Sequence, residues 1–161
     1  MYLDYLFKVF NKFKSSIAII WKGGNYTYGS LTNNIENFTL LINSHKIKPG
    51  TVVAIKGDFS PNSIALLLAL IEQACIIVPL TNTSIRNENK LFEIAQVEFV
   101  FRIDEKDNIT SESDSQRSEN NLYKVIRKRE HPGLVLFSSG TSGEPKAAVH
   151  DFLALLEKFK T

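Results

Sequence analysis

Short apolar runs and segments of helical periodicity alternate through the middle of the chain. The runs have strand character, and the segments between them carry apolar residues at the spacing of one helical face. Pro61 stands in the first turn of one such segment, where proline is favoured. The predicted elements are, in order, residues 51–56 (strand), 60–73 (helix), 75–79 (strand), 84–96 (helix) and 98–103 (strand). This alternation predicts a layered α/β fold with a mostly parallel sheet and flanking helices.

The N-terminal region begins with an amphipathic pattern. Residues 1–14 place a stripe of large apolar side chains on one helical face. We interpret this segment as a helix packed against its own domain, and a helix lying on a membrane surface is the alternative. Residues 17–21 and 26–28, separated by a glycine-rich turn, predict a β-hairpin. Ser30 is predicted to cap the next helix, which ends near residues 46–50.

The C-terminal third mixes polar and apolar segments. Residues 104–121 contain almost no apolar side chains, so they predict a flexible polar surface loop. Residues 122–128 predict an edge strand, because Lys124, Arg127, Lys128 and Arg129 would expose charge at the boundary of the sheet. Residues 134–137 predict a short buried strand, and residues 152–160 predict a helix.

Composition narrows the class of protein. A chain of 161 residues with 43% hydrophobic residues is long enough for one domain with a substantial core. The net charge of +2, carried by scattered lysines and arginines, argues against a nucleic-acid partner. The single cysteine, Cys75, excludes an internal disulfide and predicts a buried small side chain in a reducing, cytoplasmic setting. Asp4 and the lack of a long apolar run argue against a signal peptide and a transmembrane segment.

A loop rich in glycine and hydroxyl groups follows the strand predicted at residues 134–137. Glycines allow successive backbone N–H groups to point into one concavity, and a lysine supplies positive charge for an anion. The P-loop pattern of nucleotide triphosphatases does not fit, because Glu144 and Pro145 separate the last glycine from the lysine. A hydrolase nucleophile elbow does not fit either. The candidate phosphate-binding residues are Ser138, Ser139, Gly140, Thr141, Ser142, Gly143 and Lys146.

The string SSGTSGEPK within residues 133–151 resembles the signature loop of the adenylate-forming, or AMP-binding, ligase superfamily. His150 stands four residues after Lys146, as in the branch that is similar to acetyl-CoA synthetase. Ala147 departs from the pattern, because that family usually has glycine there. The segment that begins YTYGSL and ends IIVPL resembles the N-terminal subdomain of the same ligases, with Ala74 in the usual place of a glycine. The resemblance implies that residues 1–161 form part of such a ligase domain.

The resemblance also implies a chemistry. Members join a carboxylic acid to AMP: a carboxylate oxygen attacks the α-phosphorus of ATP, and pyrophosphate leaves. The signature residues would wrap the β- and γ-phosphates, with Lys146 balancing their charge and Thr141 as the best hydroxyl candidate; these two are the catalytic candidates. His150 lies near the acyl pocket in the related branch, but a histidine beside a helix cap is the alternative. ATP is the implied cofactor, with Mg²⁺ by analogy and CoA or a carrier protein as thiol acceptors.

Three functional hypotheses follow. The preferred one is an N-terminal piece or split half of an acid-activating ligase, because the downstream motifs of the family, including the catalytic lysine near its C-terminus, are not in these residues. On this hypothesis a second polypeptide completes the enzyme, and the chain alone is inactive. The second is a non-catalytic binding or assembly module that reuses the subdomain. The third is a small phosphatase or ATPase, and it lacks an evident positioned base.

Overall fold

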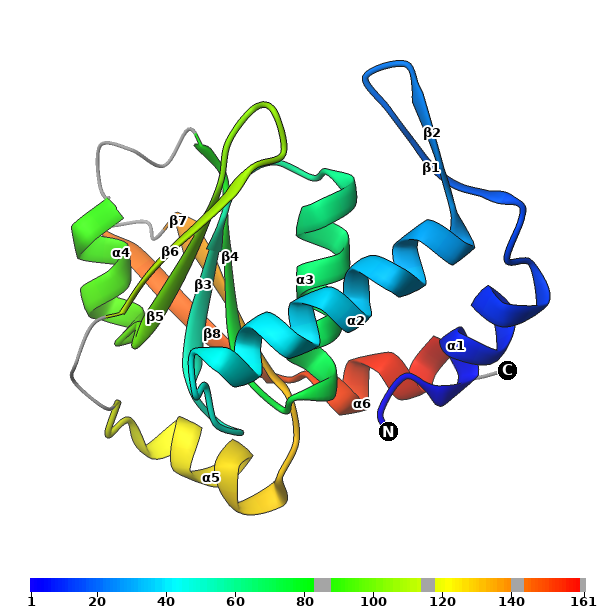
Figure 1. Cartoon of the computed structure of the whole chain (residues 1–161). Coiled ribbons are helices and arrows are strands. Elements are labelled where there is room, and N and C mark those ends of the chain that lie inside the picture. The colour runs from blue at the N-terminus through cyan, green and yellow to red at the C-terminus, as the bar shows by residue number, and fades with distance from the viewer. Residues whose placement is uncertain (83–87, 114–117, 140–143, 160–161) are drawn as a thin grey trace.

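The structure is a computed structural model that describes residues 1–82, 88–113, 118–139 and 144–159. A six-stranded sheet runs through its centre in the order β6-β5-β3-β4-β7-β8 (Figure 1). The four inner strands are parallel, and each outer strand is antiparallel to its neighbour. The strands are β3 (Val52–Lys56), β4 (Ile76–Leu80), β5 (Phe99–Ile103), β6 (Ile109–Ser113), β7 (Gly133–Ser139) and β8 (Pro145–Asp151). The predicted α/β fold with a mostly parallel sheet is confirmed.

Helices cover both faces of the sheet. Alternate residues of β3 divide the core: Val53 and Ile55 belong to one buried cluster, and Val52 and Ala54 belong to the other. The first cluster lies under α1 (Asp4–Lys12), α2 (Tyr28–Ser44), α3 (Pro61–Glu72) and α6 (Phe152–Leu156). The second lies under α4 (Glu88–Ala95) and α5 (Asn121–Arg129). The hairpin of β1 (Ile17–Trp21) and β2 (Gly24–Thr27) extends beyond the start of α2 (Figure 1).

The predicted amphipathic N-terminal helix packs against its own domain. Leu3 is fully buried and Phe10 is nearly so, while Leu6 and Phe7 pack against the first core cluster. The interpretation as a packed helix is confirmed. In α2, the side chain of Thr27 accepts a hydrogen bond from the Ser30 N–H, so Thr27 is the N-cap and the helix begins at Tyr28. The prediction that Ser30 caps this helix was wrong.

The start of α3 is fixed by its own sequence and by a distant turn. Ser60 and Ser63 form a reciprocal capping box, and Pro61 begins the helix as predicted. Asp107, from the turn between β5 and β6, accepts hydrogen bonds from the Ser60 hydroxyl at 2.5 Å and from the Asn62 N–H at 3.1 Å. A carboxylate of the chain itself therefore occupies this helix N-terminus, where negative charge is stabilised.

Two predictions in the C-terminal third were wrong. Residues 122–128 form α5 and not an edge strand, because Tyr123 and Ile126, three positions apart, face the second core cluster together. Within residues 104–121, predicted as a loop, residues 109–113 form β6, paired antiparallel with β5. β6 is an outer strand whose side chains are mostly exposed, so polar residues suit it.

Cys75 is fully buried immediately before β4, as predicted. Burial raises the pKa of its thiol to about 12. The group is therefore protonated at neutral pH and behaves as a small apolar side chain.

Candidate functional site

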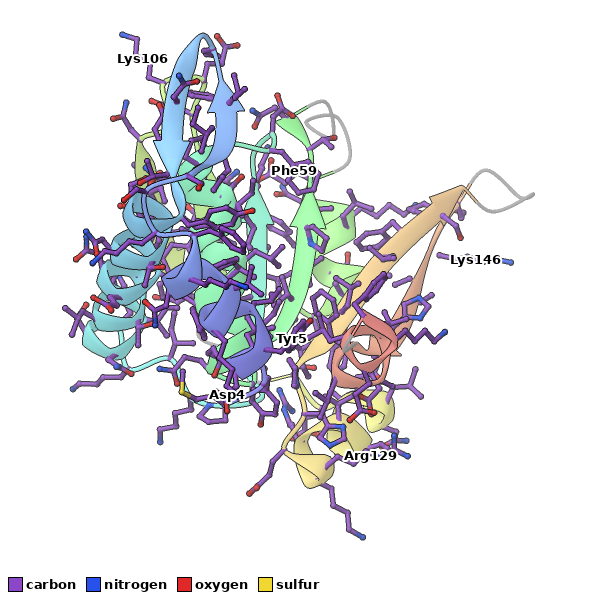
Figure 2. All side chains as sticks on the ribbon, turned by 90° about the vertical axis from the view of Figure 1, so that its right-hand side faces the viewer. Asp4, Tyr5, Phe59, Lys106, Arg129 and Lys146 are labelled. Atoms are coloured by element: carbon purple, nitrogen blue, oxygen red, sulfur yellow. The ribbon has the colours of Figure 1, made fainter. Side chains whose placement is uncertain are left out.

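The strands β7 and β8 form a ribbon that leaves the main sheet. They are paired along their whole length, from Gly133 opposite Asp151 to Ser139 opposite Pro145. β7 pairs with β4 over Gly133 and Leu134 alone. Beyond that point the ribbon leans away from β4, as Figure 2 shows, where the arm carrying Lys146 diverges from the centre of the molecule. We call the opening between β4 and β7 the fork.

Pro79 explains why the pairing stops. The Ile76 N–H bonds to Thr51 of the β3 side, whereas the Cys75 carbonyl accepts from the Gly133 N–H. Backbone polar groups alternate in direction along a strand, so those of Pro79, like those of Cys75, face β7. Proline has no N–H to donate to that neighbour. The ladder between β4 and β7 therefore ends after Ile77, and the two strands separate.

The register of the ribbon sorts its side chains onto two faces. Val135, Phe137, Ala147 and Val149 pack on or against the second core cluster. Residues that are partners across an antiparallel pair share a face. The opposite face therefore carries three cross-strand pairs: Leu134 with His150, Leu136 with Ala148, and Ser138 with Lys146.

The structure brings some of the predicted site residues together. Ser138 and Lys146 are exposed cross-strand partners near the end of the ribbon, and Ser139 ends β7. Ser139 and Pro145 are also partners, so the described chain enters and leaves the predicted phosphate loop at one end of the ribbon. The remaining candidates, Gly140, Thr141, Ser142 and Gly143, lie outside the described residues.

His150 stands directly before Asp151, the residue that caps α6, so the alternative of a histidine beside a helix cap is confirmed. It lies within β8, partly buried opposite Leu134. The strand β8 itself was not predicted from the sequence. Four residues of extended strand place the His150 Cα roughly 14 Å from that of Lys146. The two share a face, but they do not form one cluster.

A family model described as AMP-binding enzyme matches residues 6–161, nearly the whole chain. The chain belongs to the AMP-binding enzyme family. It is also 25% identical over 140 residues to bacitracin synthase 2 of Bacillus licheniformis, and this match covers 82% of the chain and 5% of that protein. The chain thus spans a small part of this relative.

Several solved structures share the fold of this chain. The NpsA N-terminal subdomain of Klebsiella oxytoca, in complex with 3-hydroxyanthranilyl-AMSN, superposes with a TM-score of 0.69 at 19% identity, covering 91% of this chain and 39% of that one. NpsA-ThdA of the same organism, an artificially fused adenylation-PCP di-domain, gives 0.70 at 18% identity, covering 92% and 32%. VinN in complex with 3-methylaspartate gives 0.68 at 17% identity, covering 92% and 46%. The chain spans less than half of each of these structures.

An ion pair ties the ribbon of this AMP-binding family member to α4. Glu144, the residue before β8, pairs with Lys90 of α4. Both side chains are about half exposed, so the pair contributes little stability and serves as a weak tether of the ribbon. Lys90 could not be predicted as a partner of Glu144, because no local pattern connects positions so far apart in the chain.

At its other end the ribbon is anchored through Asp151. Its carboxylate lies 2.9 Å from His131 Nδ1, accepts from Arg129 at 3.0 Å and caps α6 by accepting from the Ala154 N–H. Burial raises the pKa of this carboxyl, but the hydrogen bonds from His131, Arg129 and Ala154 outweigh burial and hold the pKa below its ordinary value. A lowered pKa means that the ionised form stabilises the fold.

Replacing Asp151 by asparagine tests this anchor. Asparagine preserves the size and capping ability of the side chain but removes its charge. We expect the free energy of unfolding to fall by about 1–2 kcal/mol at pH 7. A carboxyl whose pKa is lowered by folding stabilises the fold above its unfolded pKa, and this contribution is lost as the pH falls through the folded pKa. The difference in urea stability between the two proteins should therefore shrink below about pH 4, and a difference independent of pH would contradict the account.

A second charged cluster lies at the carboxyl ends of β3 and β5. Lys56 is 8% exposed and pairs with Glu88, while Arg102 contacts both Glu88 and Glu112. Burial chiefly lowers the pKa of Lys56, and the nearby Arg102 adds to this effect. These two cations and two anions satisfy one another, so the cluster offers no free charge to a ligand.

Among the described residues, no group of histidine, cysteine and acidic side chains could hold a metal ion. None of the described helices is long and apolar enough to cross a membrane.

Proposed function

We propose that this chain forms the phosphate-binding portion of an ATP-dependent ligase that activates a carboxylic acid as its adenylate. The observation that carries the proposal is the position of Lys146, exposed opposite Ser138 at the end of the ribbon where the signature sequence begins and ends. Membership of the AMP-binding family over residues 6–161 supports it. The reaction and its acid substrate are proposals for the whole protein.

In this reaction a carboxylate oxygen forms a bond to the α-phosphorus of ATP. The bond between that phosphorus and the oxygen that bridges to the β-phosphorus breaks, and pyrophosphate leaves with the electron pair. The protein needs to align the reactants and stabilise the charge that develops on the leaving group. Lys146 is proposed to do this as a flexible cation, and the Ser138 hydroxyl as a donor. Ser139, Gly140, Thr141, Ser142 and Gly143 are proposed to donate to the β- and γ-phosphates.

Magnesium and the thiol acceptor belong to the same proposal. The described residues supply no metal-binding cluster, so they do not fit a resident ion. Mg²⁺ is proposed to arrive with ATP, because this ion commonly keeps its waters and binds through substrate phosphates. Transfer of the acyl group to CoA or to a carrier protein is proposed. The solved adenylation-PCP fusion of Klebsiella oxytoca makes a carrier protein the better supported acceptor.

Calorimetric titration of the 161-residue chain with ATP, pyrophosphate and adenosine tests the proposal. All titrations contain the same magnesium concentration. Recognition through phosphates predicts that pyrophosphate binds and competes with ATP for one site, while adenosine binds far more weakly. Binding of adenosine as tight as that of ATP, or no binding of pyrophosphate, would overturn the proposal. If pyrophosphate does not bind, a non-catalytic assembly module becomes the better interpretation of the chain.

A further inference from the structure

A cavity of about 450 Å³ lies in the fork, on the face of the ribbon that carries Lys146. α3 and α6 border it on the outer side, and β3, β4 and β7 form its floor. Its volume falls within the range of small-molecule sites. The side chains that give it its apolar character are Ile55, Leu67, Pro79, Leu134, Leu136 and Phe152.

The cavity is a built feature of the fold. Pro79 ends the pairing of β4 with β7. Among the described residues, the first core cluster, which lies on this face of the sheet, includes no side chain of β7 or β8. Two large apolar side chains at the cavity therefore remain in contact with water: Leu136 is 43% exposed and Phe59 is 78% exposed. Apolar surface that lines a concave site is unfavourable in water and favourable against a hydrocarbon ligand.

Charge is distributed unequally around the cavity. His150 is the cross-strand partner of Leu134, so its Cβ lies about 5 Å from that of a lining residue. Ala148 is the cross-strand partner of Leu136, and Lys146 belongs to the next pair on the same face. The long side chain of Lys146 extends into solvent in Figure 2. Its reorientation towards the fork needs only a rotamer change, which is fast for exposed side chains. Asp58 is the acidic lining residue and comes from the β3 side.

We propose that the fork binds the hydrocarbon part of an apolar carboxylic acid, with the carboxylate directed towards β8. The apolar floor matches the hydrocarbon, Lys146 attracts the carboxylate, the His150 ring offers it a hydrogen-bond donor, and Asp58 repels it from the opposite side. This orientation brings the acid towards the end of the ribbon where the phosphates of ATP are proposed to bind. The inference rests on the proposed function and narrows its substrate class to acids with an aliphatic or aromatic body. Phe59 and Leu136 set the size of that body.

A series of straight-chain probes tests the proposal on the 161-residue chain. Hexanoate, octanoate, decanoate and neutral octanol are titrated by calorimetry. Each added methylene group should tighten carboxylate binding by about fourfold until the cavity is filled. Octanol should bind at least about fivefold more weakly than octanoate, because it lacks the charge. Affinity that does not depend on chain length, or equal binding of octanol and octanoate, would overturn the proposal.

Substitutions within the fork locate the site. Leu136→Trp fills the cavity and should weaken octanoate binding by about tenfold or more. Phe59→Ala, at a side chain too exposed to endanger folding, should weaken it by about threefold or more. Leu122→Trp is the matched control, because Leu122 is 56% exposed on α5, across the sheet from the fork, and binding should not change. Octanoate binding that both fork variants leave unchanged would overturn the proposal. The proposal would also be overturned if octanoate did not bind and the fork variants instead abolished a concentration-dependent dimer.

Pyrophosphate titrations of the same variants separate this inference from the proposed function. Phe59→Ala should leave pyrophosphate binding unchanged, since Phe59 follows β3 and is not part of the ribbon that carries Ser138 and Lys146. Intact pyrophosphate binding without octanoate binding would overturn the apolar acid site alone. Octanoate binding without pyrophosphate binding would overturn the proposed function and, with it, the assignment of the fork to an adenylated substrate.

Discussion

Replacing Arg127 by alanine is expected to lower the free energy of unfolding by about 3 kcal/mol, with an uncertainty of about 1 kcal/mol. The guanidinium donates to the Gly50 carbonyl at 2.8 Å, to the Ser118 carbonyl at 2.6 Å and to the Glu98 carboxylate at 2.6 Å. Its side chain and that of Glu98 are only 15% and 13% exposed. Truncation would leave a largely buried carboxylate without its cation and two carbonyls without this donor, and this is far more costly than losing a surface charge.

Urea denaturation of wild type and variant measures this effect. Lys124→Ala is the control on the same helix, because Lys124 is exposed and its loss should change stability by less than about 0.5 kcal/mol. The double variant with Glu98→Ala should lose less than the sum of the two single losses, since both single variants break one ion pair. A loss below about 1 kcal/mol in Arg127→Ala would contradict the role assigned to this side chain.

Lys146→Ala is expected to weaken pyrophosphate binding by about 10- to 100-fold. A charged hydrogen bond is worth about 1.5–3 kcal/mol, and this corresponds to such a change in the dissociation constant. The exposure of Lys146 means that its removal should leave the melting temperature nearly unchanged. Its contribution should weaken as salt is added, because the attraction is screened by ions.

Two further variants make the Lys146 experiment specific. Lys128→Ala removes the same charge from exposed α5 and should leave pyrophosphate binding nearly unchanged. Lys146→Arg retains the charge and should keep most of the affinity, although its planar donor group has a different geometry. Equal losses in Lys146→Ala and Lys128→Ala would show that net charge, and not this position, governs binding.

Local patterns predicted the inner part of the fold well. Strands β3, β4 and β5 and the helices between them follow from apolar runs and helical periodicity, and the capping sequence at Ser60 and Pro61 places the start of α3. The prediction of an edge strand in place of α5 gave too much weight to basic residues. Three of these, Arg127, Lys128 and Arg129, lie in the last turn of the helix, where positive charge is favourable. The spacing of Tyr123 and Ile126 was the signal that could have identified the helix.

The outer strands depend on partners that are distant in sequence. β6 is polar and has no apolar rhythm of its own, so its pairing with β5 becomes evident only in the fold. The residue types of the candidate phosphate site followed from the sequence, but the placement of Lys146 opposite Ser138 needed the register of the ribbon. The two departures from the family pattern also differ physically. Ala74 adopts a left-handed conformation with φ of 52°, which favours glycine, whereas the Ala147 side chain packs against the second core cluster.

The most direct test of the phosphate-binding proposal is a nuclear magnetic resonance titration of the isotopically labelled chain with pyrophosphate. The proposal predicts that the amide signals of Ser138, Ser139 and Lys146 shift together with a single dissociation constant, and that Lys146→Ala weakens this response. Signals from α5 and from the hairpin of β1 and β2 should stay in place. Shifts centred away from the end of the ribbon, or no shifts at concentrations at which ATP binds, would contradict the proposal.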